Sequence, residues 1–287
     1  RRSDGKETRL SAGFFAASQY WINHITGPNN KRMNHPFWTN TIWYIGLFAT
    51  SVLELVIIFM KTPDRKKTFV FCFAVLGFAY CLEALFVLIL DAYSYFPMIR
   101  PDDRFFDSVL GNIFSQVSVT ASAVLLCVLG LSNRWLLGFA IIYYLTDMLF
   151  SGIGIYQHHW YHSVYTLAGF LIFARLVKYW YHSTINAPSK KLFYPTLFLS
   201  VFGLTVNLLN TALKLFYIRI FRSGLFPFDP SRDHTATALI YGFALIVISI
   251  GLHTWKTRWY IKGFVFLLVL VFQYGLIQLN VIQVRPG

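Results

Sequence analysis

Three carboxylates lie inside apolar stretches of this chain, where an ionisable side chain is energetically expensive. Glu54, Glu83 and Asp147 each lie within a run of apolar residues, and Tyr80 shares a helical face with Glu83. In lipid such a group costs several kcal/mol, so it marks either a functional site or a polar contact that fixes helix packing. Both interpretations stay open, and we expect an intramembrane polar cluster of Glu54, Tyr80, Glu83, Asn112, Gln116 and Asp147.

Such a cluster could bind a ligand or an ion, or exchange protons with a substrate. In the second half the polar residues of the apolar runs are amides, namely Asn207, Asn210, Gln273, Gln278 and Asn280. We therefore expect the first half to carry the function and the second half to act as a scaffold. No phosphate-binding loop, dinucleotide fingerprint or nucleophile elbow is present in the sequence, so no reaction class is indicated and no cofactor can be identified.

The densest polar motif is the run His158-His159-Trp160-Tyr161-His162. On a helix, His158 and His162 would be four residues apart and could reach one metal ion. The metalloprotease motif with this spacing carries a glutamate base between its histidines, which this run lacks. Trp160 and Tyr161 are also typical of the aromatic belt at a membrane surface. We expect an interfacial anchor here and no metal site, with His158 and His162 as the only metal candidates.

Two Phe-Pro loops carry most of the remaining charge. Each contains a second proline and an arginine, and their polar residues would form either the rim of a cleft or a rigid turn held by salt bridges. The candidate rim residues are Asp103, Arg104, Asp107, Asp229 and Arg232.

The composition indicates a membrane protein. The chain has 287 residues, of which 56% are hydrophobic and only 13% charged, against about 25% charged in a soluble domain. The net charge of +13 comes largely from short basic clusters between apolar runs, where such residues meet anionic headgroups. We therefore expect membrane lipids, including bound lipid, as partners and no nucleic acid.

The apolar runs are long enough to cross about 30 Å of hydrocarbon as helices. They predict an all-α, polytopic integral membrane protein with about eight transmembrane helices. Residues 1–40 form a polar N-terminal segment in which Leu10, Phe14, Ala17, Trp21 and Ile25 share one helical face, which predicts an amphipathic interfacial helix. The expected spans are 41–60, 69–95, 108–131, 135–156, 162–181, 193–217, 235–254 and 260–282.

Short motifs recur along the chain and predict an internal repeat. A Lys-Lys pair, a Phe-Pro loop and an Arg-Trp pair each occur twice in the same order, at Lys66-Lys67 and Lys190-Lys191, Phe96-Pro97 and Phe226-Pro227, and Arg134-Trp135 and Arg258-Trp259. This divides the chain into two four-helix units, 41–160 and 161–287. An even number of spans per unit gives both units the same orientation, which is a parallel repeat.

Two resemblances bear on function. KKLFYPTLFLSVFGLTVNLL, with Tyr194-Pro195-Thr196, and the YQHHWYH stretch resemble an uncharacterised family of small multi-pass membrane proteins from spore-forming Firmicutes. That family implies a bacterial plasma membrane location and no known activity.

A looser similarity is to the emopamil-binding and sterol-isomerase group. It rests on HPFW, GFAYCLEALFVL and LGNIF. The resemblance implies a helical bundle in which Glu83 matches one of the acids that move a proton on a sterol ring. The histidine of that pattern would fall near Tyr80 and its second acid near Ser118, so two of the expected proton-carrying groups are missing from this chain. The resemblance therefore implies a cavity for a hydrophobic ligand more directly than isomerase activity.

The leading expectation is a non-enzymatic structural or accessory subunit of a membrane assembly, with protein partners in that complex. The alternative is a transporter or hydrophobic-ligand binder with a polar intramembrane cleft around Glu83 and Asp147. A lipid- or sterol-directed isomerase-like enzyme using Glu83 as acid and base is the third hypothesis. An accessory subunit predicts acids locked by partners, whereas a binder predicts a ligand-sized cavity beside them.

Overall fold

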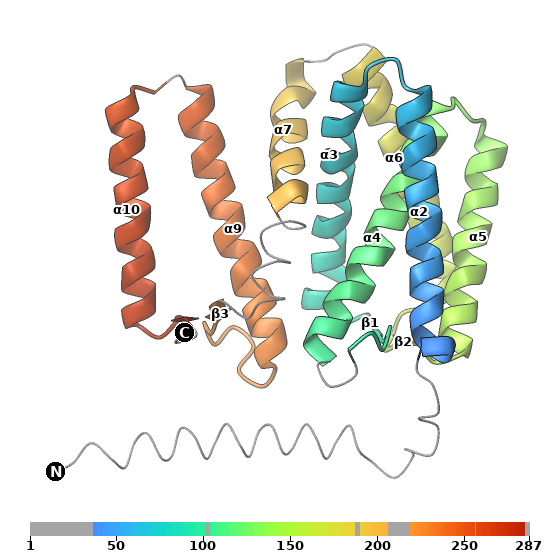
Figure 1. The fold of residues 1–287 in the computed structure, drawn as a ribbon, viewed down its shortest axis with the longest axis horizontal. Helices are drawn as coiled ribbons and strands as arrows, with labels where there is room; N and C mark the ends of the chain where they lie inside the picture. Colours follow the sequence, from blue (N-terminus) through green and yellow to red (C-terminus); the bar gives the residue numbers. More distant parts are fainter. Residues whose placement is uncertain (1–36, 101–103, 187–189, 206–218, 256, 285–287) are drawn as a thin grey trace, which may run out of the picture.

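A computed structural model describes residues 37–100, 104–186, 190–205, 219–255 and 257–284 of the chain (Figure 1). The described residues are mostly helical. The helices are α2 (Ile42–Lys61), α3 (Arg65–Glu83), α4 (Arg104–Val128), α5 (Asn133–Gly152), α6 (Ser163–Tyr181), α7 (Lys190–Thr205), α9 (Pro230–Thr254) and α10 (Trp259–Gln278), with π-helical segments η1 (Phe37–Thr41), η2 (Ala84–Ile89) and η3 (His182–Asn186).

Six of these helices are long and apolar enough to cross a membrane, which supports a polytopic helical membrane protein. They are the segments Phe37–Lys61, Arg65–Ile89, Phe106–Val128, Asn133–Gly152, Arg232–Thr254 and Trp259–Gln278. Helix α6 carries Arg175 and Lys178 and does not qualify, and the described part of α7 is shorter than a span. The expected interfacial helix within residues 1–40 lies outside the described residues.

Four three-residue strands lie where the sequence predicted helix ends or loops. They are β1 (Tyr93–Tyr95), β2 (Tyr156–His158), β3 (Arg219–Phe221) and β4 (Ile282–Val284). β1 pairs with β2 and β3 pairs with β4, both antiparallel. The expected spans 69–95, 135–156 and 260–282 were therefore too long, because the apolar and aromatic residues continue past the last helical turn into these strands.

Helices α2 to α6 pack into one bundle whose core includes Phe71, Val75, Val124, Phe173 and Val177. Helix α4 contacts α2, α3 and α6, and α5 packs on α6. Helix α6, which follows the expected boundary between 160 and 161, packs on α4 and α5; the division into two four-helix units stays a prediction.

The connection from this bundle to the rest of the chain runs through α3 and α7. A Cβ added at Gly77 would lie 2.1 Å from the Leu199 carbonyl oxygen, and one added at Gly203 would lie 2.2 Å from that of Phe73. Only glycine permits this approach. Ser200 Oγ also donates to the Val70 carbonyl at 2.9 Å, so α3 and α7 are joined by backbone contact as well as side-chain packing.

The order strand, helix, helix, strand occurs twice at a constant spacing of 126 residues. β1 and β3 start at residues 93 and 219, α4 and α9 at 104 and 230, α5 and α10 at 133 and 259, and β2 and β4 at 156 and 282. Both strand pairs lie at the lower end of the helices in Figure 1.

Backbone details follow the same spacing. Met98 and Gly224 have positive φ values of 54° and 80°, and Gly154 and Asn280 have φ values of 78° and 58°. The Phe-Pro motifs at residues 96 and 226 are 130 residues apart, so the sequence motifs that predicted the repeat are not in the register of the elements.

Candidate functional site: a tyrosine-lined cavity with two carboxylates

Glu83 is the last residue of α3 and is buried within the first bundle. Its Oε2 accepts hydrogen bonds from Tyr93 Oη at 2.6 Å and from Gln116 Nε2 at 2.7 Å. Its Oε1 accepts from Asn112 Nδ2 at 2.9 Å and from Tyr95 Oη at 3.0 Å. Four donors surround one carboxyl group, which matches the ionised form, since that form only accepts hydrogen bonds.

Strand β1 presents both tyrosines to Glu83. Burial raises the pKa of Tyr93 and of Tyr95 well above the usual tyrosine value, and the nearby Glu83 charge adds to this effect. Both phenols therefore stay protonated and act as donors. Gly111 on α4 makes room for this strand, because an added Cβ there would lie 2.7 Å from the Tyr95 Cβ.

The segment between Glu83 and β1 is held at its carbonyl groups. Trp160 Nε1 donates to the Leu90 carbonyl at 2.6 Å, and His159 Nδ1 lies 2.9 Å from the Asp91 carbonyl oxygen. Arg232 of α9 donates to the carbonyls at the end of η2. The π-helical segment η2, which joins Glu83 to its tyrosine donors, is thus held by hydrogen bonds from both halves of the chain. π-Helical turns are frequent at functional sites.

Asp147 on α5 is the second buried carboxylate, with its side chain 5% exposed. Its Oδ2 accepts a hydrogen bond from Thr166 Oγ1 at 2.6 Å. Its Oδ1 lies 3.1 Å from His158 Nε2, but neither atom has a partner in hydrogen-bond geometry. Asp147 therefore keeps one acceptor oxygen unused at a buried position, which is unusual in a folded protein.

Both carboxylates line one cavity of about 200 Å³. Helices α2 to α6 and strands β1 and β2 all contribute to its wall. Phenol rings form much of the polar lining, and the described lining residues include no Lys, Arg or His. The lining residues with polar side chains are Tyr44, Glu83, Tyr93, Tyr95, Ser115, Gln116, Tyr143, Thr146, Asp147, Tyr156, Tyr161 and Thr166.

The structure divides the predicted polar cluster. Glu83, Asn112 and Gln116 are joined by hydrogen bonds, and Asp147 faces the same cavity. Glu54 instead accepts from Ser122 Oγ, at 2.8 and 2.9 Å, and it does not line the cavity.

Tyr80 also lies elsewhere, in a cluster with Leu76, Phe202 and Ile246. This cluster joins α3 to α7 and α9. Sharing a helical face with Glu83 in the sequence therefore did not bring Tyr80 to the cavity.

The loop residues act within turns. Buried Asp107 accepts from the backbone amides of Met98 and Ile99, both at 2.7 Å. Asp229 Oδ1 accepts from the Arg232 amide at 3.0 Å, and the Arg232 side chain holds η2 as described above. Asp103 lies outside the described residues, and the Arg104 side chain is not described.

His158 and His162 do not lie on one helix, because His158 ends β2 and His162 precedes α6. The helical spacing that made them a candidate pair is therefore absent. Across the described ranges no group of three or more His, Cys, Asp or Glu side chains could hold a metal ion.

Sequence reasoning missed the tyrosines that surround the carboxylates. Tyr44, Tyr93, Tyr95 and Tyr156 come from a helix start and two short strands. The Tyr-Ser-Tyr alternation at 93–95 covers only three residues, so the sequence predicts the end of a span there and no strand. Comparison of the chain with protein-family models, curated proteins and solved structures finds no match.

Proposed function

We propose that the first bundle binds a small amphipathic molecule that carries a positively charged amine, with the charge beside Asp147 and the apolar part among the tyrosine rings. The observation that carries this proposal is the unused, buried Oδ1 of Asp147 in a cavity that also holds Glu83. This proposal corresponds to the hydrophobic-ligand binder that the sequence offers as the alternative to an accessory subunit.

The size of the cavity supports a small ligand or a single head group. A dry apolar cavity of roughly 150 Å³ holds one benzene molecule, and the cavity here is about 200 Å³. This volume matches one ring with a short amine, or one part of a larger amphipathic molecule.

The charge of the lining supports a cationic group. Two carboxylates face the cavity, and its described lining residues include no Lys or Arg. The imidazole of His158 lies 3.1 Å from Asp147 Oδ1 but outside hydrogen-bond geometry, so a bound amine would compete with it for this oxygen. Aromatic rings attract a cation over their faces, and Tyr143, Tyr156 and Tyr161 supply such rings. The similarity to the emopamil-binding group, which implies a cavity for a hydrophobic ligand, points in the same direction.

The proposal is tested with benzyldimethylamine, which is protonated at neutral pH, and with isobutylbenzene, its neutral isostere. Binding to the purified full-length chain in detergent is measured by calorimetry. The amine should bind at least about tenfold more tightly than the isostere, because a buried charge pair contributes more than 1.4 kcal/mol. Asp147→Asn should abolish this preference while isobutylbenzene binding persists.

Glu54→Gln is the matched control, since Glu54 lies in the same bundle but outside the cavity. This variant should keep the preference for the amine. Equal binding of the two compounds to the unmodified chain would contradict the proposal, as would an amine preference that survives Asp147→Asn.

We also propose that the chain arose by duplication of a unit of about 126 residues. The repeated element starts and the matched positive-φ positions support this, and so do Asp107 and Asp233. Each is buried in the first turns of its helix and accepts hydrogen bonds from the amides of the preceding loop. A structure of the chain determined by electron microscopy, superposed on itself with a shift of 126 residues, tests it: the two strand pairs and their helices should overlay.

A second candidate function, the accessory subunit, is favoured by one observation. Helix α10 buries none of the residues in its apolar window, so partner helices would have a large surface to cover. Blue native electrophoresis of membranes in mild detergent tests this: a stable complex with other proteins supports it, and a chain that migrates alone contradicts it.

A further inference from the structure

Arg219, the first residue of β3, packs its guanidinium group against two aromatic rings. Its guanidinium carbon lies 4.7 Å from the centre of the Phe221 ring and 5.5 Å from that of Tyr241. These contacts hold the flat guanidinium group against two rings, from β3 and α9. Arginine is well suited to such stacking because its charge is delocalised and weakly hydrated.

No carboxylate of the described part of the chain forms an ion pair with this cation. Its Nε is buried and has no hydrogen-bond partner among the described residues. Burial lowers the pKa of Arg219, which reflects the cost of keeping a charge in this position. A buried donor without an acceptor is rare in a folded protein and is consistent with a position where an ion or a water molecule binds.

The acids of the second half are engaged elsewhere. Residues 161–287 contain twelve Lys and Arg against two acids, Asp229 and Asp233. Asp233 accepts from Ser223, Gly224 and Phe226 in the loop, and Asp229 accepts from the Arg232 amide. Among the described residues no acid is paired with Arg219, which leaves its guanidinium group available to an anion from another molecule.

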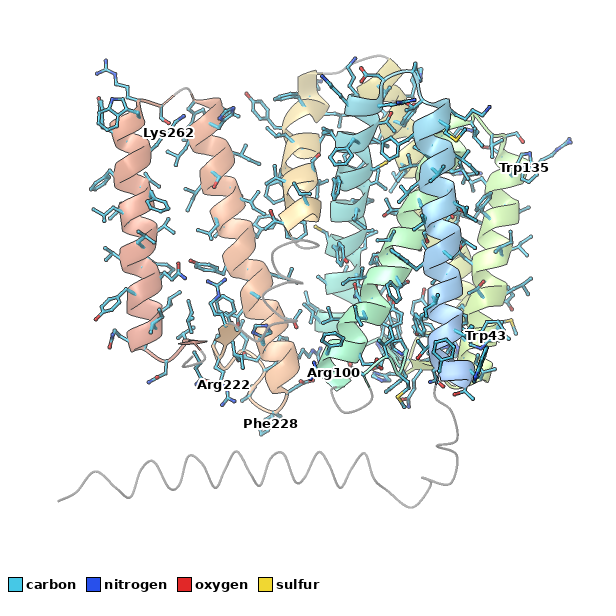
Figure 2. The ribbon with its side chains drawn as sticks, in the orientation of Figure 1. Trp43, Arg100, Trp135, Arg222, Phe228 and Lys262 are labelled. Atoms are coloured by element: carbon cyan, nitrogen blue, oxygen red, sulfur yellow. The ribbon has the colours of Figure 1, made fainter. Side chains whose placement is uncertain are left out.

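The position of Arg219 indicates the source of that anion. β3 lies at the lower ends of α9 and α10 in Figure 1, and exposed Arg222 lies at the same end in Figure 2. Exposed apolar side chains, among them Phe243 on α9 and Tyr274 on α10, leave surface on both helices for an acyl chain.

We propose that Arg219 binds an oxyanion, the phosphate or carboxylate head of an acidic membrane lipid, at the end of α9 and α10. The fork of guanidinium donors matches two oxygens of such a group. Tyr241 and Gln273, whose Oη and Oε1 are 3.5 Å apart, lie beside it as further polar groups. This site is independent of the amine site in the first bundle.

The test is native mass spectrometry of the full-length chain released from nanodiscs of phosphatidylcholine with phosphatidic acid. The unmodified chain should retain phosphatidic acid in preference to phosphatidylcholine. Arg219→Gln should reduce that preference by about tenfold, the effect of one charge-assisted hydrogen bond, and Arg219→Lys should give an intermediate value. Arg222→Gln, which removes an equal charge from the same end, should change it less than about twofold, as expected for an exposed charge.

Thermal melting in lipid-free detergent separates the two sources of oxyanion. Stabilisation by inorganic phosphate that disappears in Arg219→Gln assigns the site to a free anion and overturns the lipid assignment. Equal retention of phosphatidic acid by the unmodified chain and by a folded Arg219→Gln variant overturns the site itself. If Arg219→Gln does not fold, Arg219→Lys decides between these outcomes, because it keeps the charge and loses only the fork.

Discussion

The two halves of the chain place different charges at equivalent positions of the same element order. Tyr93 begins β1 and donates to Glu83, whereas Arg219 begins β3 and has no acidic partner among the described residues. Asp147 lies on α5 where Gln273 lies on α10, fourteen residues after the start of each helix. One half therefore offers carboxylates to a ligand, and the other half offers a guanidinium group.

The halves also differ in enclosure. In the first half α4 and α5 pack against α6, which lines one side of the cavity with Thr166 and Phe170. In the second half α10 buries none of the residues in its span. Helix α6 packs on α4 and α5, and among the described elements no helix makes comparable contacts with α10. The same order of elements thus has a polar cavity within a bundle in one half and exposed apolar helix surfaces in the other.

The largest expected effect comes from a substitution at the α3–α7 contact, which joins the two halves. Gly77→Ala should destabilise the chain by about 3 kcal/mol or more, since the added methyl would overlap the Leu199 carbonyl and force α3 and α7 apart. Gly46→Ala is the control, because nothing lies within 4 Å of its added Cβ. Thermal melting in detergent measures both. A Gly77→Ala variant as stable as the unmodified chain would show that the two halves are not held by this contact.

A smaller effect distinguishes the hydrogen bonds around Glu83 in the first half from the Tyr241–Gln273 contact in the second half. Tyr93→Phe removes a buried donor to the Glu83 carboxylate and should cost about 1.5 to 3 kcal/mol. Tyr241→Phe removes only the 3.5 Å contact with Gln273 and should cost less than about 0.5 kcal/mol. Equal losses in melting temperature for the two variants would contradict the view that only the first half has a tightly bonded polar core.

The smallest effect concerns a surface cap that leaves both sites intact. The hydrogen bond from the Lys67 amide lowers the pKa of Asp64, which precedes α3. A carboxylate with a lowered pKa stabilises the fold above its unfolded pKa of about 3.9, and that stabilisation is lost as the pH falls further. Asp64→Ala should therefore lower the melting temperature slightly at pH 7, and this effect should become smaller as the pH is lowered below about 3.9. A difference that grows towards pH 3 would contradict this assignment.

The sequence predicted the helical membrane fold because long apolar runs leave few alternatives to a spanning helix. It also predicted Glu83, Asn112 and Gln116 as one cluster, because α3 and α4 bring them together as spans in one bundle. It did not predict the tyrosine donors, since strands of three residues are too short for an alternation pattern to stand out from an apolar helix.

Two further differences have similar causes. Glu54 was grouped with Glu83 because both lie in spans, but the rotation of α2 places Glu54 against Ser122 instead. The sequence predicts no binding role for Arg219, since an arginine between two apolar runs is typical of the boundary charges that orient helices in a membrane. Its aromatic contacts depend on the pairing of β3 with β4, which no local pattern specifies.

The most direct test of opposite ligand charge in the two halves uses one experiment on three proteins. The unmodified chain, Asp147→Asn and Arg219→Gln are each placed in phosphatidylcholine nanodiscs with phosphatidic acid and benzyldimethylamine, and native mass spectrometry records what each retains. We expect Asp147→Asn to lose the amine and keep phosphatidic acid, and Arg219→Gln to do the reverse. Loss of both ligands in either folded variant, or of neither in both, would contradict two separate sites of opposite charge.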